Sequence, residues 1–181
     1  MWFSFRNSSQ SESMPTDEAS LEFRLLQNGC VVLYHNPFLL EAHSGLLVRR
    51  GWQFKEICIA EKGTAEEFYD QVSSTLGFPS YFGRNLDAFR DCLGDIDFPE
   101  SQRLALGLIR FDLVAKHDAK YAHIVLDICA EAERRWLMEG KRILFLVQSS
   151  DPDLRFPPIG ATSALWNFEE WLDSKRKGPK Q

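Results

Sequence analysis

The chain has 181 residues and a formal net charge of −5, and 44% of its residues are hydrophobic. This length suits a single core, and no apolar stretch approaches the ~20 residues that a membrane span requires. The acidic balance disfavours a nucleic-acid ligand, because phosphate binding needs a clustered cationic surface, and it favours a basic protein partner.

The first 20 residues are rich in Ser, Gln, Glu and Pro, a composition that predicts a disordered tail. Their opening, "MWFSFRN", is far shorter than the apolar region of a signal peptide. The cysteines lie far apart, without a CxxC pair, and each lies in an apolar stretch: Cys30, Cys58, Cys92 and Cys129. We therefore expect reduced thiols in the core and a cytoplasmic location.

Residues 21–52 are expected to form an extension made of a hairpin and a helix. Apolar-rich residues on both sides of Asn28-Gly29 predict a β-hairpin over residues 21–34, because both turn residues tolerate positive φ. A weaker helical pattern over residues 38–50 ends in Arg49-Arg50-Gly51, which is typical of a helix C-terminus.

Residues 53–148 alternate between strand and helix patterns. Strands are predicted over residues 53–60, 104–111 and 142–147, and helices over residues 64–76, 111–117 and 121–140. The clearest of these is the helix that begins with the capping box Thr64-Ala65-Glu66-Glu67. The alternation predicts an α/β fold, a small parallel sheet packed with helices and preceded by the N-terminal hairpin.

The C-terminal region, residues 149–181, is expected to be a loop followed by a helix and a basic tail. Prolines mark residues 151–164 as a loop, and Asn167 followed by Glu170 suits the start of a last helix through Ser174. The basic residues after it are interpreted as a solvated tail.

Common catalytic and cofactor motifs are absent from the sequence. It contains no P-loop, no GxGxxG, no GxSxG and no HExxH. The histidines lie apart, and His117 and His123 would point to opposite sides of a helix, so surface or capping roles are favoured over metal ligation. No metal and no cofactor are expected.

The sequence has one dense cluster of charged residues, the acidic stretch 84–100, which follows an aromatic pair. Asp87 and Asp91 stand at i and i+4 on a predicted helix that begins at Asn85, where like charges destabilise by a few tenths of a kcal/mol. A solvated helix face explains Asn85 as N-cap and Asp87 in the first turn. It explains neither Asp91 nor the adjacent Tyr81 and Phe82, which suggest a contact surface.

A third interpretation makes Asp87 and Asp91 a general acid and base pair, as in a glycosidase. Such a pair needs opposed carboxyls in a cleft and at least one raised pKa. Neighbours on one convex helix rarely meet these conditions, so we expect open exposure and no enzyme.

The segment "GFPSYFGRNLDAFRDCL" resembles the signature of the barstar family, intracellular inhibitors of small ribonucleases such as barnase. The predicted order of strands and helices from about residue 53 to 148 is similar to that family as well. The N- and C-terminal segments look like those of a longer form. The resemblance implies an immunity-type protein whose partner is a small basic ribonuclease or toxin.

The resemblance also implies the target-binding residues. Asp91 would lie at the centre of the inhibitory surface with Asp87 beside it, and Tyr81 and Gly83 would line a loop pressed against the ribonuclease. The full expected set is Tyr81, Phe82, Gly83, Asn85, Asp87, Arg90, Asp91 and Glu131. Carboxylates on a rigid helix suit a cationic active site that holds RNA phosphates.

Departures from the family pattern leave the target open. Arg90 stands where the archetype has a tryptophan, Ile96 replaces another aromatic residue, and the contact glutamate of the long helix falls on Arg135. Either the target differs from barnase or Glu131, one turn earlier, takes that role. The alternative function is an interaction module of the same fold with a non-nuclease partner.

Overall fold

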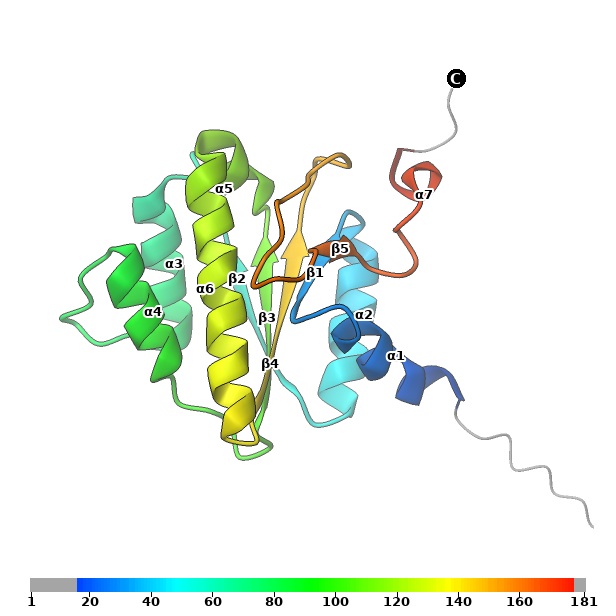
Figure 1. The fold of residues 1–181 in the computed structure, drawn as a ribbon, viewed down its shortest axis with the longest axis horizontal. Coiled ribbons are helices and arrows are strands. Elements are labelled where there is room, and N and C mark those ends of the chain that lie inside the picture. Colours follow the sequence, from blue (N-terminus) through cyan, green and yellow to red (C-terminus); the bar gives the residue numbers. More distant parts are fainter. Residues whose placement is uncertain (1–15, 178–181) are drawn as a thin grey trace, which may run out of the picture.

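A computed structural model describes residues 16–177 as an α/β layer structure (Figure 1). Its elements, in chain order, are α1 (Thr16–Leu26), β1 (Val31–Tyr34), α2 (Pro37–Arg49), β2 (Gln53–Cys58), α3 (Ala65–Leu76), α4 (Leu86–Gly94), β3 (Arg103–Ile109), α5 (Asp112–His117), α6 (Ala119–Met138), β4 (Arg142–Gln148), β5 (Leu165–Trp166) and α7 (Asp173–Lys177). The strands form one five-stranded sheet in the order β2-β3-β4-β1-β5. All its pairings are parallel, which confirms the predicted fold class.

The two faces of the sheet are covered by different parts of the chain. Figure 1 shows α3, α4, α5 and α6 on one face and α1 and α2 on the other. Alternate residues of β4 pack on opposite faces of the sheet, because successive side chains of a strand point to opposite faces. Phe145 and Val147 join the core under α6, whereas Leu144 and Leu146 pack with Leu25 and Leu47 of α1 and α2.

The predicted N-terminal hairpin is wrong. Residues 16–26 form α1, and β1 pairs in parallel with β4 instead of folding back on its predecessor. Leu21 and Leu25 stand at helical spacing, and both are buried against the sheet. Gly29, at φ 105°, makes the turn into β1. Of the expected tail, residues 16–20 belong to α1 and residues 1–15 lie outside the described part.

The prediction for residues 167–174 is also wrong. Asn167 leads a turn in which its side chain accepts a hydrogen bond from the backbone N–H of Glu169, and the last helix, α7, begins only at Asp173. The basic tail is not wholly solvated. Arg176 is buried; its guanidinium lies over the Trp166 ring at 4.5 Å and donates to the carbonyl of Pro152.

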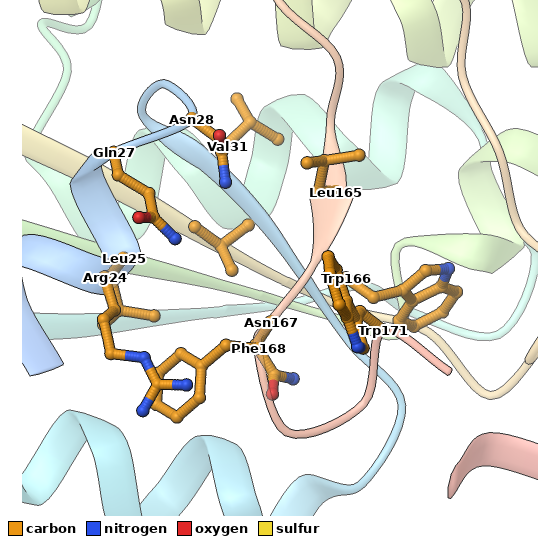
Figure 2. Close-up of a pocket in the computed structure, with 11 residues that line it drawn as sticks. Arg24, Leu25, Gln27, Asn28, Val31, Leu165, Trp166, Asn167, Phe168 and Trp171 are labelled. Atoms are coloured by element: carbon orange, nitrogen blue, oxygen red, sulfur yellow. The ribbon is translucent and has the colours of Figure 1, made fainter. Parts of the chain in front are cut away.

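The N- and C-terminal segments meet at the β5 edge of the sheet. Figure 2 shows the Arg24 guanidinium over the Phe168 ring, at 3.3 Å from its centroid, with Trp166 and Trp171 on the other side of a pocket of about 380 Å³. The Glu170 carboxylate accepts hydrogen bonds from the backbone N–H groups of His35 and Asn36 at 2.9 and 2.8 Å. The two segments therefore support each other.

Two side-chain expectations need correction. Cys58 is exposed and Cys92 is only partly buried, so they are not core thiols as Cys30 and Cys129 are; all four are free. Burial raises the pKa of Cys30 to about 12, which leaves it a neutral thiol. His43 is not a surface residue: it is 4% exposed and stacks on Phe168.

Candidate functional site

The loop before helix α4 is held in place by hydrogen bonds of the Asn85 side chain. The Asn85 side chain accepts a hydrogen bond from the Ala88 N–H at 2.9 Å and donates one to the Gly83 carbonyl at 3.1 Å. This confirms Asn85 as the N-cap. A Cβ atom on Gly83 would lie 3.1 Å from the Asn85 Nδ2, so glycine lets the loop pass close to the cap. Phe89 and Leu93 bury the opposite face of α4 and fix its position.

The two aspartates of α4 lie on its open face. The Asp87 side chain is 91% exposed, and Asp91 is exposed as well. Among residues 16–177, no hydrogen bond or ion pair engages the Asp91 carboxylate. Asp91 is therefore an exposed acid on a rigid helix, and its carboxylate oxygens are available to accept hydrogen bonds from a partner.

Arg90 ties α4 to α6. Its guanidinium donates to Asp87 Oδ1 at 2.9 Å and to Glu131 Oε2 at 3.0 Å. The hydrogen bond to Glu131 is the main cause that raises the pKa of Arg90. Arg90 thus offsets the charge of both acids, whereas Asp91, the next residue in the helix, keeps its charge uncompensated.

Other acids near α4 are paired as well. Arg84, at φ 49°, donates to Asp70 Oδ1 at 2.6 Å, and this hydrogen bond lowers the pKa of Asp70. Arg135 of α6 contacts Asp95 at 3.4 Å. These pairs are exposed, and such pairs contribute little to stability. Their effect is to leave the surface less acidic than its composition implies.

The aromatic pair before α4 has divided roles. Tyr81 is 85% exposed in the loop that leads to the helix. Phe82 is partly buried, with its ring 5.0 Å from that of Phe78 and 5.6 Å from that of Tyr69. Phe82 therefore fastens the loop to the core, and Tyr81 is the aromatic side chain that the loop presents.

The predicted residues come from three segments, and the structure shows contacts between Gly83 and Asn85 and between Arg90, Asp87 and Glu131. Tyr81, Phe82, Gly83 and Asn85 come from the loop; Asp87, Arg90 and Asp91 from α4; and Glu131 from α6. Glu131 joins the group through Arg90. The contact spans 41 positions in sequence, so helical spacing could not reveal it. The loop 156–162 lies within the predicted loop 151–164, but its contact with α6 was not predicted.

Residues 16–177 contain neither a metal-ligand cluster nor a helix that could span a membrane. Within the described residues, no cluster of three or more His, Cys, Asp or Glu side chains is arranged to hold a metal ion. No helix in that part of the chain has the length and apolarity to span a bilayer.

The candidate surface on α4, the preceding loop and α6 lies in a part of the chain that matches a known protein family. The family described as Barstar (barnase inhibitor) matches residues 52–148. The chain belongs to the barstar family. A Bacillus subtilis (strain 168) protein named "Putative ribonuclease inhibitor YrdF" is 39% identical over 80 residues, which are 44% of this chain and 84% of the relative.

The barstar-family match covers three adjacent strands at one side of the sheet. It includes β2, β3 and β4 with α3 to α6, and therefore the whole candidate surface on α4. The strands β1 and β5 and the helices α1, α2 and α7 lie outside it. The division of the chain at residues 20, 52 and 148 into tail, extension, barstar-like domain and C-terminal region stays a prediction.

Proposed function

We propose that this chain is an immunity-type inhibitor that blocks the active site of a small basic ribonuclease with the open face of α4. The single observation that carries the proposal is Asp91: it is exposed on a capped helix, beside acids that already have cationic partners. An active site that binds RNA phosphates must be cationic, so this carboxylate takes the place of a phosphate and pairs with basic side chains there.

The family and the named relative support the proposal at the level of ribonuclease inhibition. The inhibitor acts in the cytoplasm, where its free cysteines stay reduced. Asp87 adds a second charge beside Asp91, and Tyr81 supplies aromatic area at the edge of the contact. A few residues carry most of the binding energy of such an interface, and we expect Asp91 to be one of them.

An enzymatic role for the two aspartates fits the geometry poorly. A carboxylate dyad needs a cleft that excludes water and raises at least one pKa. Asp87, at 91% side-chain exposure, lies in open solvent instead.

A second candidate is an interaction module with a non-nuclease partner. The observation in its favour is the set of arginines that pair with Asp70, Asp87 and Asp95, because they offset the acidity that a cationic active site would recognise. Such a partner would contact the guanidinium groups as much as Asp91.

The test compares two substitutions that change net charge equally. Wild type, Asp91→Ala and Asp97→Ala are immobilised, and an extract of the producing cells is passed over each; retained RNase activity is then titrated with the free proteins. Asp97 is exposed but lies outside α4. We expect wild type and Asp97→Ala to retain and inhibit the activity, and Asp91→Ala to lose both by at least about tenfold. Equal inhibition by Asp91→Ala and wild type would contradict the proposal.

A further inference from the structure

The loop 156–162 is fastened along the outward side of α6. The carbonyl of Pro158 accepts a hydrogen bond from His123 Nε2 at 3.0 Å. The N–H of Gly160 donates to Asp127 Oδ1 at 2.8 Å, and its carbonyl accepts from Arg134 at 2.9 Å. The loop therefore holds one position on the helix, although it belongs to the segment beyond the barstar-family match.

The backbone of this loop is shaped for close approach. Ile159 is 1% exposed, and the N–H of Thr162 donates to its carbonyl at 2.9 Å, which closes a tight turn. Gly160 has φ 54°, and a Cβ atom there would lie 2.8 Å from the Cβ of Ala130. The next residue, Ala161, is exposed at φ 73° and forms the outer corner of the turn.

A hollow of about 430 Å³ lies between this loop and α4, with α6 as its floor. Figure 1 shows α6 between α4 and the segment that follows β4. The hollow is lined by Arg90, Ile124, Asp127, Ile128, Glu131, Arg134, Pro158, Gly160 and Ala161. Arg90 and Glu131 belong to the candidate target surface too, so the hollow continues that surface across α6.

The usual size of a stable protein interface suggests that the target contacts more than α4. A specific interface covers roughly 800 Å² on each partner, which one face of the nine-residue helix α4 cannot supply. A ribonuclease seated on Asp91 must also contact whatever lies beside α4. On the α6 side, that is the hollow and then the loop.

We infer that the loop 158–161 and the hollow extend the ribonuclease-binding surface, and that the hollow receives an uncharged polar side chain of the target, such as the amide of Asn or Gln. This inference rests on the proposed function. The charges of Arg90 and Arg134 cancel those of Asp127 and Glu131. Because all four already have partners within the protein, the hollow offers their remaining N–H groups and oxygen lone pairs to a group that both donates and accepts.

The test uses two neutral substitutions on exposed positions of the same segment. Ala161→Gln places a larger side chain at the mouth of the hollow, and Ser163→Gln adds a matched change outside its lining. Binding of the ribonuclease that immobilised wild type retains from the cell extract is measured by titration calorimetry at low and at high salt, with Asp91→Ala in parallel. Thermal melting of each variant checks that the fold is kept.

We expect Ala161→Gln to weaken binding about tenfold, a difference of about 1.4 kcal/mol, and Ser163→Gln to leave it unchanged. The effect of Ala161→Gln should persist at high salt because the hollow is neutral, whereas the effect of Asp91→Ala should shrink. Wild-type affinity of Ala161→Gln with a loss for Asp91→Ala would overturn the extended surface alone. Wild-type affinity of Asp91→Ala would overturn the proposed contact on α4, and retention of no RNase activity by immobilised wild type would overturn both.

Discussion

Among single residues, we expect Arg90 to have the strongest effect on which target the protein binds. It holds Asp87 and Glu131 at 2.9 and 3.0 Å, so the self-repulsion of the acids on α4 and α6 is reduced in the free protein. A target that brings its own cations must either displace this guanidinium or accept it. Arginine at this point therefore disfavours a cationic group on the target opposite Arg90 and favours an acidic or hydrogen-bonding group there.

The first prediction at this scale concerns barnase, whose affinity for wild type we expect to be only micromolar. Arg90→Ala removes a cation from the contact and frees two carboxylates, so inhibition of barnase should improve by about tenfold or more, equivalent to about 1.4 kcal/mol or more. RNA cleavage by barnase, measured against increasing inhibitor, gives the result.

The matched control is Arg84→Ala, which removes the same charge but frees Asp70 on α3. Its effect on barnase inhibition should be smaller. Complete inhibition by wild type at equimolar nanomolar concentration would show that Arg90 is tolerated and that the inferred change of specificity is wrong.

Among the elements, the turn 167–170 is joined to β1 and α2 by a chain of polar groups that is buried at Tyr34 and His43 and exposed at Glu169. Tyr34 O–H lies 2.9 Å from His43 Nδ1, and His43 Nε2 lies 3.1 Å from Glu169 Oε1. An ionised carboxylate can only accept hydrogen bonds. The neutral His43 ring therefore donates a hydrogen bond from Nε2 to Glu169 and accepts one at Nδ1 from the Tyr34 O–H. A protonated ring would lose the bond from Tyr34.

This arrangement predicts acid-sensitive packing of the C-terminal turn. Burial is the main cause that lowers the pKa of His43 from 6.5, against the opposing hydrogen bond to Glu169. The unfolded chain then binds the proton more readily, so the free energy of unfolding should fall as the pH drops below 6.5 towards the lowered pKa. Urea unfolding at a series of pH values, followed by tryptophan fluorescence, measures this slope.

His43→Gln should flatten the slope in that pH window, even if it lowers stability at every pH. His117→Gln changes an exposed histidine on α5 and serves as the control. An unchanged slope in His43→Gln would show that other groups cause the acid sensitivity.

Prediction from sequence succeeded where an element carries its own signal. Thr64 accepts a hydrogen bond from the Glu67 N–H at the start of α3, as the predicted capping box implied. It failed for β5, because two residues are too few to show periodicity. The burial of Arg176 was equally hidden, since the ring and backbone carbonyls around it, those of Trp166, Pro152 and Trp171, are brought together by the tertiary fold.

Across the whole molecule, the segments outside the barstar-family match complete the second face of the sheet. Ala105, Leu144 and Leu146 are buried there at 0% exposure, under α1 and α2. The apolar surface that α1 and α2 cover therefore belongs to strands of the matched region. The N-terminal and C-terminal segments are thus part of the protein's folded core, and their removal exposes apolar surface.

The excised segment 52–148 should therefore bind a hydrophobic dye and self-associate, in contrast to the full chain. Size-exclusion chromatography and dye fluorescence measure both properties. Replacing Leu144 and Leu146 with Ser should make the excised segment more soluble and the full chain less stable, by about 2 to 5 kcal/mol for each buried leucine. A monomeric excised segment without dye binding would contradict the structural role of α1 and α2.

The position of β1 has a consequence for synthesis on the ribosome. Val31 pairs with Phe145 of β4, and His35 meets Glu170 across 135 positions in sequence. A strand that emerges early must wait unpaired until nearly the whole chain has been made, because its neighbours on both sides come last. Contacts of such long range slow folding and leave an apolar strand open to wrong pairing in the meantime. Nascent chains stalled before β4 should consequently be protease-sensitive from α1 through α2, and protection should arise only once β5 has left the exit tunnel.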